Sequence, residues 1–187
     1  MKAGTLFLVV GPSGAGKDTL IQGAHAVLAD DPGFVFARRA ITRPATAGGE
    51  DLRQMTPEEF RRELEAGGFM LSWSAYGLDY GIPSSYVEDL ASGRHVVANV
   101  SRSVIDAAMA RFDPVRVIHV TAPPEVLARR LARRGREDET GVRERLARAD
   151  LDLPAGVKVT EIMTDAPQEA GVRRLVEALK HAAAERC

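Results

Sequence analysis

The sequence predicts an α/β fold in which helices flank a parallel sheet, and three stretches carry this prediction. The apolar run at residues 5–10 is followed by a glycine-rich loop and then by a helical pattern. Residues 95–100 and 115–121 are apolar and β-branched with a helical pattern between them, which favours parallel pairing through a right-handed crossover. A last strand at 157–163 precedes a helical tail at 168–185. The sum is a three-layer α/β domain.

Local signals predict the elements of the first half. A helix is expected from Lys17 to the turn at 30–33, and residues 34–42 look extended. Residues 43–54 are polar and rich in Gly, Pro and Thr, as in a loop that either binds a ligand or lies at the surface. Thr56, Pro57 and Glu59 form a capping-box pattern, so a helix should run from there to the glycines at 67–68.

The second half follows the same logic. Short strands are expected at 69–73 and 76–80, and a helix at 83–92, so residues 37–92 form an excursion from the main sheet. Helices are also expected at 101–111, from 124 to 134 and around 142–150. The tail places four apolar side chains on one helical face: Val172, Leu175, Val176 and Leu179.

Length and composition limit the functions to consider. A chain of 187 residues can bury one hydrophobic core, so we expect one folding unit. Lys and Arg number 25 against 26 Asp and Glu, so no overall basic field favours nucleic acid as a partner. Cys187 is the only cysteine, which fits a reducing cytosol. With no secretory leader and no apolar run near about 18 residues, we expect a soluble, cytoplasmic protein without membrane contact.

The most informative motif is a nearly complete phosphate-binding loop between the first strand and helix. It comprises Gly11, Pro12, Ser13, Gly14, Ala15, Gly16, Lys17 and Asp18, followed by Thr19. The glycines let consecutive N–H groups turn toward phosphate oxygens, and Lys17 supplies a mobile cation for the β- and γ-phosphates. The alternative is an ordinary glycine turn, which would gain nothing from Lys17. A nucleotide phosphate chain is therefore the predicted ligand.

The last position of this loop departs from the usual pattern. Asp18 stands where Ser or Thr normally binds Mg²⁺, and Thr19 follows it, within reach of an α-phosphate oxygen. A carboxylate suits a hard cation, so Asp18 is a candidate metal ligand, directly or through water. The competing interpretation is that Asp18 only favours the helix N-terminus, by about 0.3–1 kcal/mol.

An arginine-rich segment follows the strand expected at 115–121. Eight arginines fall between residues 129 and 148, mixed with four acidic residues. On composition alone this is a solvated pair of salt-bridged helices. Beside a phosphate loop, a mobile arginine segment can instead stabilise a migrating phosphoryl group and exclude water.

These residues resemble the guanylate kinase superfamily over nearly the whole chain. The matching motifs are GPSGAGKD at 11–18, ITR at 41–43, Trp73 with YG at 80–81, RLARRGRE at 130–137 and RERL at 143–146. The resemblance implies a P-loop NTPase fold with a core at 1–36, 93–125 and 150–187, an acceptor-binding insertion at 37–92 and an arginine lid at 126–149. By the same match, Arg43 and Tyr80 correspond to acceptor-phosphate ligands, and the lid arginines are Arg130, Arg134 and Arg145.

Three departures argue against GMP as the acceptor. A second arginine expected after Arg43 is Thr46, and the base-reading glutamate before the tryptophan is replaced by Ser72. An aspartate-rich strand end reads Asn99-Val100-Ser101-Arg102. A guanine base would lose a carboxylate that accepts from its N–H edge, and buried unpaired donors are heavily penalised.

A narrower resemblance accounts for these departures. GKD in the loop, ITR followed by AGGED, LSW, GLDYG and NVSR look like the ribose 1,5-bisphosphate phosphokinases of bacterial phosphonate breakdown, which carry aspartate after the loop lysine. The resemblance implies that ATP, with Mg²⁺, phosphorylates the 1-phosphate of ribose 1,5-bisphosphate to give 5-phosphoribosyl 1-diphosphate (PRPP) and ADP. It leaves the oligomeric state open.

Each residue has an expected role and a plainer alternative. No general base is needed, because the accepting phosphate oxygen is already anionic. The loop amides and Lys17 would hold the donor phosphates, and Asn99 and Arg102 are candidates for the sugar or its second phosphate. Alternatively, Arg43 pairs an acidic neighbour, Tyr80 packs and Asn99 ends a strand. Two other functions stay open: a nucleoside monophosphate kinase with an unusual base pocket, and a catalytically silent protein-binding module.

Overall fold

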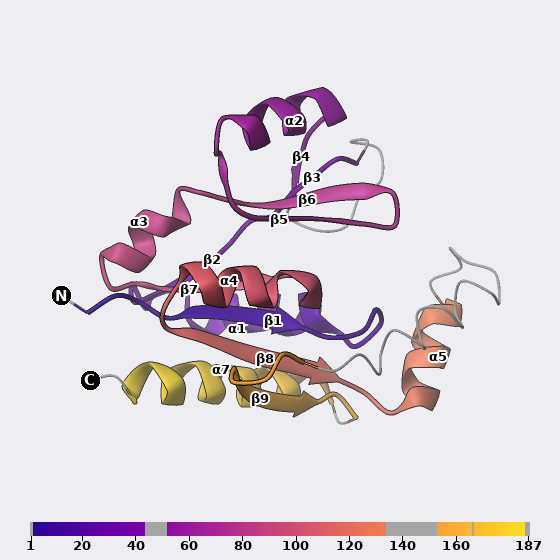
Figure 1. Cartoon of the computed structure of the whole chain (residues 1–187). Helices are drawn as coiled ribbons and strands as arrows, with labels where there is room; N and C mark the ends of the chain where they lie inside the picture. Colours follow the sequence, from indigo (N-terminus) through magenta and orange to yellow (C-terminus); the bar gives the residue numbers. More distant parts are fainter. Residues whose placement is uncertain (1, 44–51, 134–152, 166, 186–187) are drawn as a thin grey trace. The chain divides into compact units, whose positions relative to one another are not determined.

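The computed structural model describes residues 2–43, 52–133, 153–165 and 167–185, and these residues form two compact units (Figure 1). Unit 1 comprises Met1–Leu8 and Asp31–Val115. Unit 2 comprises Val9–Asp30 and Arg116–Cys187. The expected boundaries of core, insertion and lid stay a prediction.

Unit 1 contains one side of the parallel sheet. Its strand order is β2-β7-β1, made of β2 (Phe34–Phe36), β7 (His95–Asn99) and the first part of β1 (Leu6–Val10). β2 and β7 run parallel, with Phe34 opposite His95. The ring of Phe7 lies 6.5 Å from that of Phe34 and 6.0 Å from that of His95. An aromatic cluster thus joins β2, β7 and β1 at their start. The direct pairing expected between residues 95–100 and 115–121 is wrong, because β1 lies between β7 and β8 in the strand order of the sheet.

A second, smaller sheet in unit 1 has the strand order β4-β3-β6-β5. Its strands are β3 (Ala40–Ile41), β4 (Arg53–Gln54), β5 (Phe69–Ala75) and β6 (Leu78–Pro83). Helix α2 (Pro57–Glu65) covers one face of this sheet (Figure 1). Four buried residues form the core between them: Ala40, Met55, Phe60 and Phe69. The rings of Phe60 and Phe69 stack at 4.6 Å.

Three details of unit 1 differ from the expectations. The expected polar loop ends in β4, which pairs in parallel with β3 and is too short for a sequence pattern to indicate. The extended stretch at 34–42 divides into β2 and β3, which belong to different sheets. The helix expected at 83 begins at Tyr86 as α3 (Tyr86–Ala91), because Pro83 ends β6 opposite Phe69, at a strand end where the missing N–H costs little.

The capping box of α2 is confirmed by reciprocal hydrogen bonds. Thr56 Oγ1 accepts from the Glu59 N–H at 3.2 Å, and the Glu59 carboxylate accepts from the Thr56 N–H at 2.8 Å. The helix expected at 101–111 begins as a 3₁₀ turn, η2 (Arg102–Val104), and continues as α4 (Ile105–Arg111). The hydroxyl of Ser101 caps η2 by accepting from the Ser103 N–H at 3.3 Å.

Unit 2 contains the other side of the parallel sheet. Its strand order is β1-β8-β9, with β8 (Val115–Thr121) and β9 (Lys158–Met163) parallel and Thr121 opposite Met163. The helices are α1 (Lys17–Val27), α5 (Pro124–Arg133) and α7 (Gln168–Ala184). α1 and α7 lie side by side (Figure 1), and Val172, Leu175 and Leu179 are buried as predicted.

The α/β class with a parallel sheet is therefore confirmed. The helical pattern expected at 142–150 lies outside the described residues. Among the helices that the structure describes, none combines the length and the apolar character that a membrane span requires.

Candidate functional site

The glycine loop of unit 2 links β1 to α1, as its motif predicts. Gly16 is the N-cap of α1 with φ of 91°, a left-handed conformation that favours glycine. Gly11 lies so close to β8 that a Cβ at this position would be 1.9 Å from the Val120 carbonyl oxygen. The loop can pass over the sheet end and turn into the helix only with glycine at these two positions.

The loop presents main-chain donors and one ammonium. The N-cap residue of α1, Gly16, has no side chain with which to cap the helix, and the first-turn N–H groups and positive dipole end of a helix are suited to an anion. Lys17 Nζ donates to the Gly11 carbonyl at 2.7 Å and to the Pro12 carbonyl at 3.0 Å. The Ala15 N–H closes the turn on the Pro12 carbonyl at 3.3 Å. Lys17 is thus folded across the loop, where a phosphate chain would meet it.

The hydroxyl of Thr164, a residue that is only 8% exposed, joins the loop to the sheet end. Its Oγ1 lies 2.8 Å from the Ala15 carbonyl oxygen and 3.1 Å from the Thr121 carbonyl oxygen. The C=O and N–H groups of a trans peptide point in opposite directions. Because the Ala15 carbonyl is held toward Thr164, the N–H of Gly16 points away from Thr164. Thr164 therefore orients one amide of the phosphate loop.

Arg130 of α5 completes this network. Its Nη1 donates to Thr164 Oγ1 at 3.0 Å and to the Gly14 carbonyl at 3.2 Å, and its Nη2 donates to the Thr164 carbonyl at 3.0 Å. The structure thus brings this predicted lid arginine to the loop, where it bonds main-chain carbonyls. Arg134 and Arg145 lie outside the described residues.

A cavity of 370 Å³ adjoins the loop within unit 2. Its lining includes Gly16, Thr19, Arg130, Thr164 and Gln168. It combines loop main chain, a guanidinium and the first turn of α7. This composition suits the remainder of a nucleotide whose phosphates occupy the loop.

Asp18, the proposed metal ligand, is the second residue of α1 and is half-buried. Among the residues that the structure describes, no three His, Cys, Asp or Glu side chains gather into a metal-binding group. Mg²⁺ typically uses one or two carboxylates together with substrate phosphates and water. One carboxylate beside a phosphate loop therefore fits Mg²⁺ brought in with the nucleotide.

In unit 1, Tyr80 and Trp73 form a stacked pair on the small sheet. They are opposite each other in the β5·β6 register, and their rings stack at 5.4 Å with an interplanar angle of 5°. Ile41 of β3 is opposite Tyr80 on its other side. Side chains that are opposite each other across antiparallel strands share a face of the sheet. Ile41, Tyr80 and Trp73 therefore lie on one face. Ala40, the neighbour of Ile41, lies on the other face, which packs against α2. Phe69 is buried, whereas Trp73 is half-exposed.

Arg39 is a candidate that the sequence reasoning missed. Its guanidinium carbon lies 6.0 Å from the centroid of the Tyr80 ring. Arg39 directly precedes β3, two residues before Ile41, which is opposite Tyr80. The strand alternation, continued backward from Arg43, is the signal that would have found it.

The strand register changes the interpretation of Ser72. Ser72 is opposite Gly81, so its side chain lies on the face opposite that of Tyr80. The neighbour on the face of Tyr80 is Leu71, which is buried and apolar. Among the described residues of β3, β5 and β6, no carboxylate shares the face of Tyr80. The match of the base-reading glutamate to Ser72 stays a prediction.

Asn99 and Arg102 lie at the end of β7 and the start of η2. Asn99 is 7% exposed and Arg102 is half-buried. η2 packs against β5, the strand that carries Trp73. This brings Arg102 to the neighbourhood of the small sheet, and its role stays a prediction.

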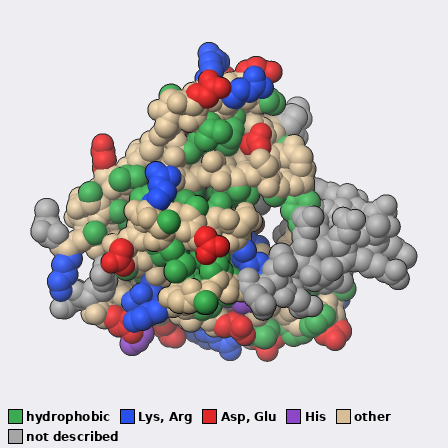
Figure 2. Space-filling view, in the orientation of Figure 1, with side chains coloured by type: hydrophobic (Ala, Val, Ile, Leu, Met, Phe, Trp, Pro, Cys, Tyr) green, Lys and Arg blue, Asp and Glu red, His purple; other side chains and the backbone are tan. Residues whose placement is uncertain are grey.

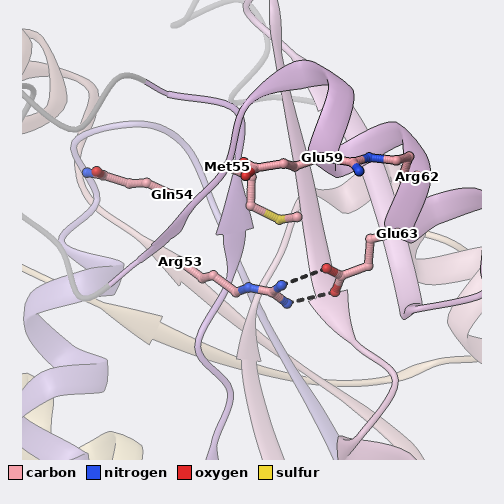
Figure 3. A pocket seen from close by; sticks show the side chains of 6 residues that line it. All are labelled: Arg53, Gln54, Met55, Glu59, Arg62 and Glu63. Carbon is pink, nitrogen blue, oxygen red and sulfur yellow. Dashed lines mark hydrogen bonds and ion pairs between the residues drawn. The ribbon is translucent and has the colours of Figure 1, made fainter.

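A second cavity, of 450 Å³, lies between β4 and α2 in unit 1 (Figure 3). Arg53 and Glu63 form a two-point ion pair in it, with both N···O distances at 2.7 Å. The pKa of Glu59 is lowered, chiefly by the hydrogen bond from the Thr56 N–H. Charges of both signs are interspersed over α2 (Figure 2). Because Arg53 of β4 and Glu63 of α2 pair with each other in this cavity, we do not treat it as the functional site.

No protein-family model matches the sequence. Among curated proteins, the ribose 1,5-bisphosphate phosphokinase PhnN of Rhodopseudomonas palustris is 48% identical over 178 residues, which cover 95% of this chain and 89% of that protein. A bifunctional ribose 1,5-bisphosphokinase-thymidine phosphorylase of Cupriavidus necator is 50% identical over 181 residues, covering 96% of this chain and 30% of that protein. The chain therefore spans less than a third of the length of such bifunctional relatives.

Among solved structures, a guanylate kinase from Anaplasma phagocytophilum matches with a TM-score of 0.70. The match covers 97% of this chain and 87% of that chain, at 19% sequence identity. This likeness supports the predicted guanylate kinase-like fold and nothing more specific.

Proposed function

Because the chain belongs to the ribose 1,5-bisphosphate phosphokinase family, we propose that it transfers the γ-phosphoryl group of ATP to the 1-phosphate of ribose 1,5-bisphosphate. An oxygen of the 1-phosphate forms a bond to the γ-phosphorus. The bond from that phosphorus to the β,γ-bridging oxygen breaks, and ADP leaves with the electron pair. The products are PRPP and ADP, and no general base is required because the attacking oxygen is already anionic.

The observation that carries this proposal is a phosphate loop on the same chain as a sheet face that combines Arg39 with the aromatic hydroxyl of Tyr80 and has no carboxylate in its described strands. A guanine base needs an acceptor for its N–H edge, and an unpaired buried donor costs about 1–3 kcal/mol. A sugar bisphosphate needs no such acceptor and gains from each cation. The face therefore favours a phosphorylated sugar over GMP.

On the donor side, we propose that ATP phosphates bind the loop amides and Lys17, and that the rest of the nucleotide occupies the 370 Å³ cavity. Asp18 would hold Mg²⁺ with the phosphates, directly or through water. The metal would neutralise charge on the transferred group when bound. Thr164 and Arg130 would keep the loop amides aimed at the phosphates.

On the acceptor side, Arg43 and Tyr80 would bind the acceptor phosphates. Arg134 and Arg145 would close over the transferred group, where planar guanidinium groups match phosphate oxygens. Asn99 and Arg102 would contact the sugar. We further propose that the protein acts in the cytoplasm, in phosphonate catabolism, where it supplies PRPP.

The test is an acceptor panel. The protein is incubated with ATP and Mg²⁺ and with ribose 1,5-bisphosphate, GMP or another nucleoside monophosphate, and ADP is followed together with the phosphorylated product. We expect turnover only when ribose 1,5-bisphosphate is the acceptor, with ADP and PRPP formed in equal amounts. Turnover with GMP and none with the sugar bisphosphate would indicate a nucleotide kinase. No turnover with any acceptor would favour a silent protein-binding module.

A further inference from the structure

The cavity beside the phosphate loop has two groups of described lining residues. One group lies at the phosphates: Gly16 and Thr19 are at the N-terminus of α1, and Arg130 Nη1 is 3.9 Å from the position of a Cβ at Gly16. The other group, which we call the far wall, comprises Leu20, Met163, Pro167, Gln168 and Gly171. With the α-phosphate at Thr19, the sugar and base of a nucleotide would lie against the far wall.

Polar groups at the end of β9, beside the far wall, are already bonded within the fold. Thr164 Oγ1 lies 2.8 Å from the Ala15 carbonyl oxygen and accepts from Arg130 Nη1 at 3.0 Å. The Met163 carbonyl accepts from Arg174 Nη1 at 3.0 Å. These bonds hold the loop and the last strand in place. The groups that make them are therefore poorly suited to choosing between two bases.

Gln168 has a different position and chemistry. Among the described residues of the far wall, it alone has a polar side chain. It is the first residue of α7 and is exposed, so its amide is free to turn over. An amide carries an acceptor and a donor side by side. In one orientation it accepts from the amino group of adenine and donates to N1. Turned over, it donates to O6 of guanine and accepts from the N1–H.

We propose that Gln168 contacts the base of the donor nucleotide and that this site accepts both purines, so that GTP can replace ATP. The inference rests on the proposed function and deepens its donor side. A site that fixes hydrogen-bonding groups against one ligand rejects its analogue by about 10⁴–10⁵-fold, whereas a site that recognises mainly shape reaches only about 100-fold. The far wall is of the second kind.

The first measurement compares the two nucleotides in the wild type. Calorimetry gives the Kd of ATP and of GTP with Mg²⁺ and without an acceptor, so that binding does not depend on which acceptor is used. Rates with ribose 1,5-bisphosphate then give kcat/KM for each donor. We expect both ratios to stay within about 100-fold.

The second measurement changes the amide. Gln168→Glu supplies acceptors only, which suit the N1–H and 2-amino group of guanine but face the lone pair of adenine N1. The ratio of the Kd of ATP to that of GTP should therefore rise about 10- to 100-fold over the wild type. Gln168→Met has a similar length without hydrogen bonds and should weaken both nucleotides equally. A carboxylate in the first turn of α7 also suits the helix dipole, so this variant should fold.

The adjacent Glu169 offers a control for charge. It lies in the same first turn of α7, is exposed and is not among the lining residues. Glu169→Gln changes the local charge by one unit, as Gln168→Glu does in the opposite direction, and should leave the ratio at its wild-type value. Thermal unfolding of each variant is measured first.

Two results would overturn the inference. One is a preference of the wild type for ATP of more than about 100-fold. The other is an unchanged ratio in folded Gln168→Glu, which would place Gln168 away from the base. Failure of the proposed function looks different, because both nucleotides would then bind while no PRPP forms. A wild type that binds neither nucleotide would contradict both.

Discussion

The proposed phosphate sites, in the loop of unit 2 and on the small sheet of unit 1, are built by different means. The loop relies on main-chain amides and a helix N-terminus, with Lys17 as its mobile cation. The sheet relies on side chains, among them the stacked pair Trp73 and Tyr80 and the guanidinium of Arg39. Main-chain amides are present whatever the side chains are, so a main-chain site binds any phosphate chain. Side chains on a sheet can be substituted singly, so they can determine which acceptor binds. We therefore expect changes in the loop to affect every acceptor equally, and changes on the sheet to alter acceptor choice.

The largest expected effect is at Lys17. Lys17→Ala removes the cation that faces the donor phosphates, so kcat/KM should fall by about 10²–10³-fold, with the same factor for every acceptor that the wild type uses. ADP release measures this loss. Lys158→Ala, which removes a lysine 69% exposed on β9, should retain full activity. A loss at Lys17 that differs between acceptors would break the distinction between the two regions.

Thr164 tests whether the main-chain site depends on a distant side chain. Thr164→Val removes the hydroxyl that lies 2.8 Å from the Ala15 carbonyl oxygen and accepts from Arg130 Nη1, so both groups lose this partner, at a cost of about 1–3 kcal/mol. The KM of ATP should rise about tenfold, since 1.4 kcal/mol corresponds to that factor. The acceptor's KM should stay unchanged. Thr164→Ser keeps the hydroxyl and should restore ATP binding; a serine variant as weak as the valine variant would contradict this role.

Asp18 separates metal binding from helix electrostatics. Asp18→Ala should raise the Mg²⁺ concentration for half-maximal rate several-fold while the KM of ATP changes less, because the carboxylate is a hard-cation ligand. Titration of the rate with Mg²⁺ at saturating ATP measures the effect. An unchanged Mg²⁺ dependence would leave only the interaction with the α1 dipole.

Tyr76 tests the backbone of the sheet region. It occupies the β5–β6 turn with φ of 53°, while its side chain is 56% exposed. Left-handed backbone costs most residues roughly 1–2 kcal/mol, and Asn tolerates it better. Tyr76→Asn should raise the melting temperature by about 2–4 °C. Gly77→Ala, at φ of 73°, should lower it. A Tyr76→Asn variant that melts below the wild type would indicate that the ring contributes more than its strain costs.

The smallest effect concerns the pH dependence of α2. The folded-state pKa of Glu59 is lowered from its ordinary value of 4.5, chiefly by the Thr56 N–H. A carboxyl with a depressed pKa adds stability that is complete above the ordinary value and is lost as the pH falls through the folded-state pKa. Melting of the wild type and of Glu59→Gln against pH should therefore converge in acid. Curves that stay parallel would contradict the charge effect.

How far the site was predictable depends on the range of the interactions. The phosphate loop and the α2 capping box are local patterns, and both occur where the sequence predicts them. The two-residue strand β4 was missed because two residues show no periodic pattern, and the strand exists only through its pairing with β3. The contacts of Thr164 and Arg130 with the phosphate loop could not be predicted either, because 149 and 116 residues separate them from their partners in the loop.

The sequence by itself determined the α/β class, the phosphate loop, and through its motifs the family. Those features depend on backbone preferences and periodicities within a few consecutive residues. Only the tertiary structure decided that Thr164 orients the Gly16 amide, that Leu71 rather than Ser72 shares the face of Tyr80, and that Arg39 stacks on that ring. Each of these depends on strand register or on packing between distant segments, where a shift of one residue moves a side chain to the opposite face.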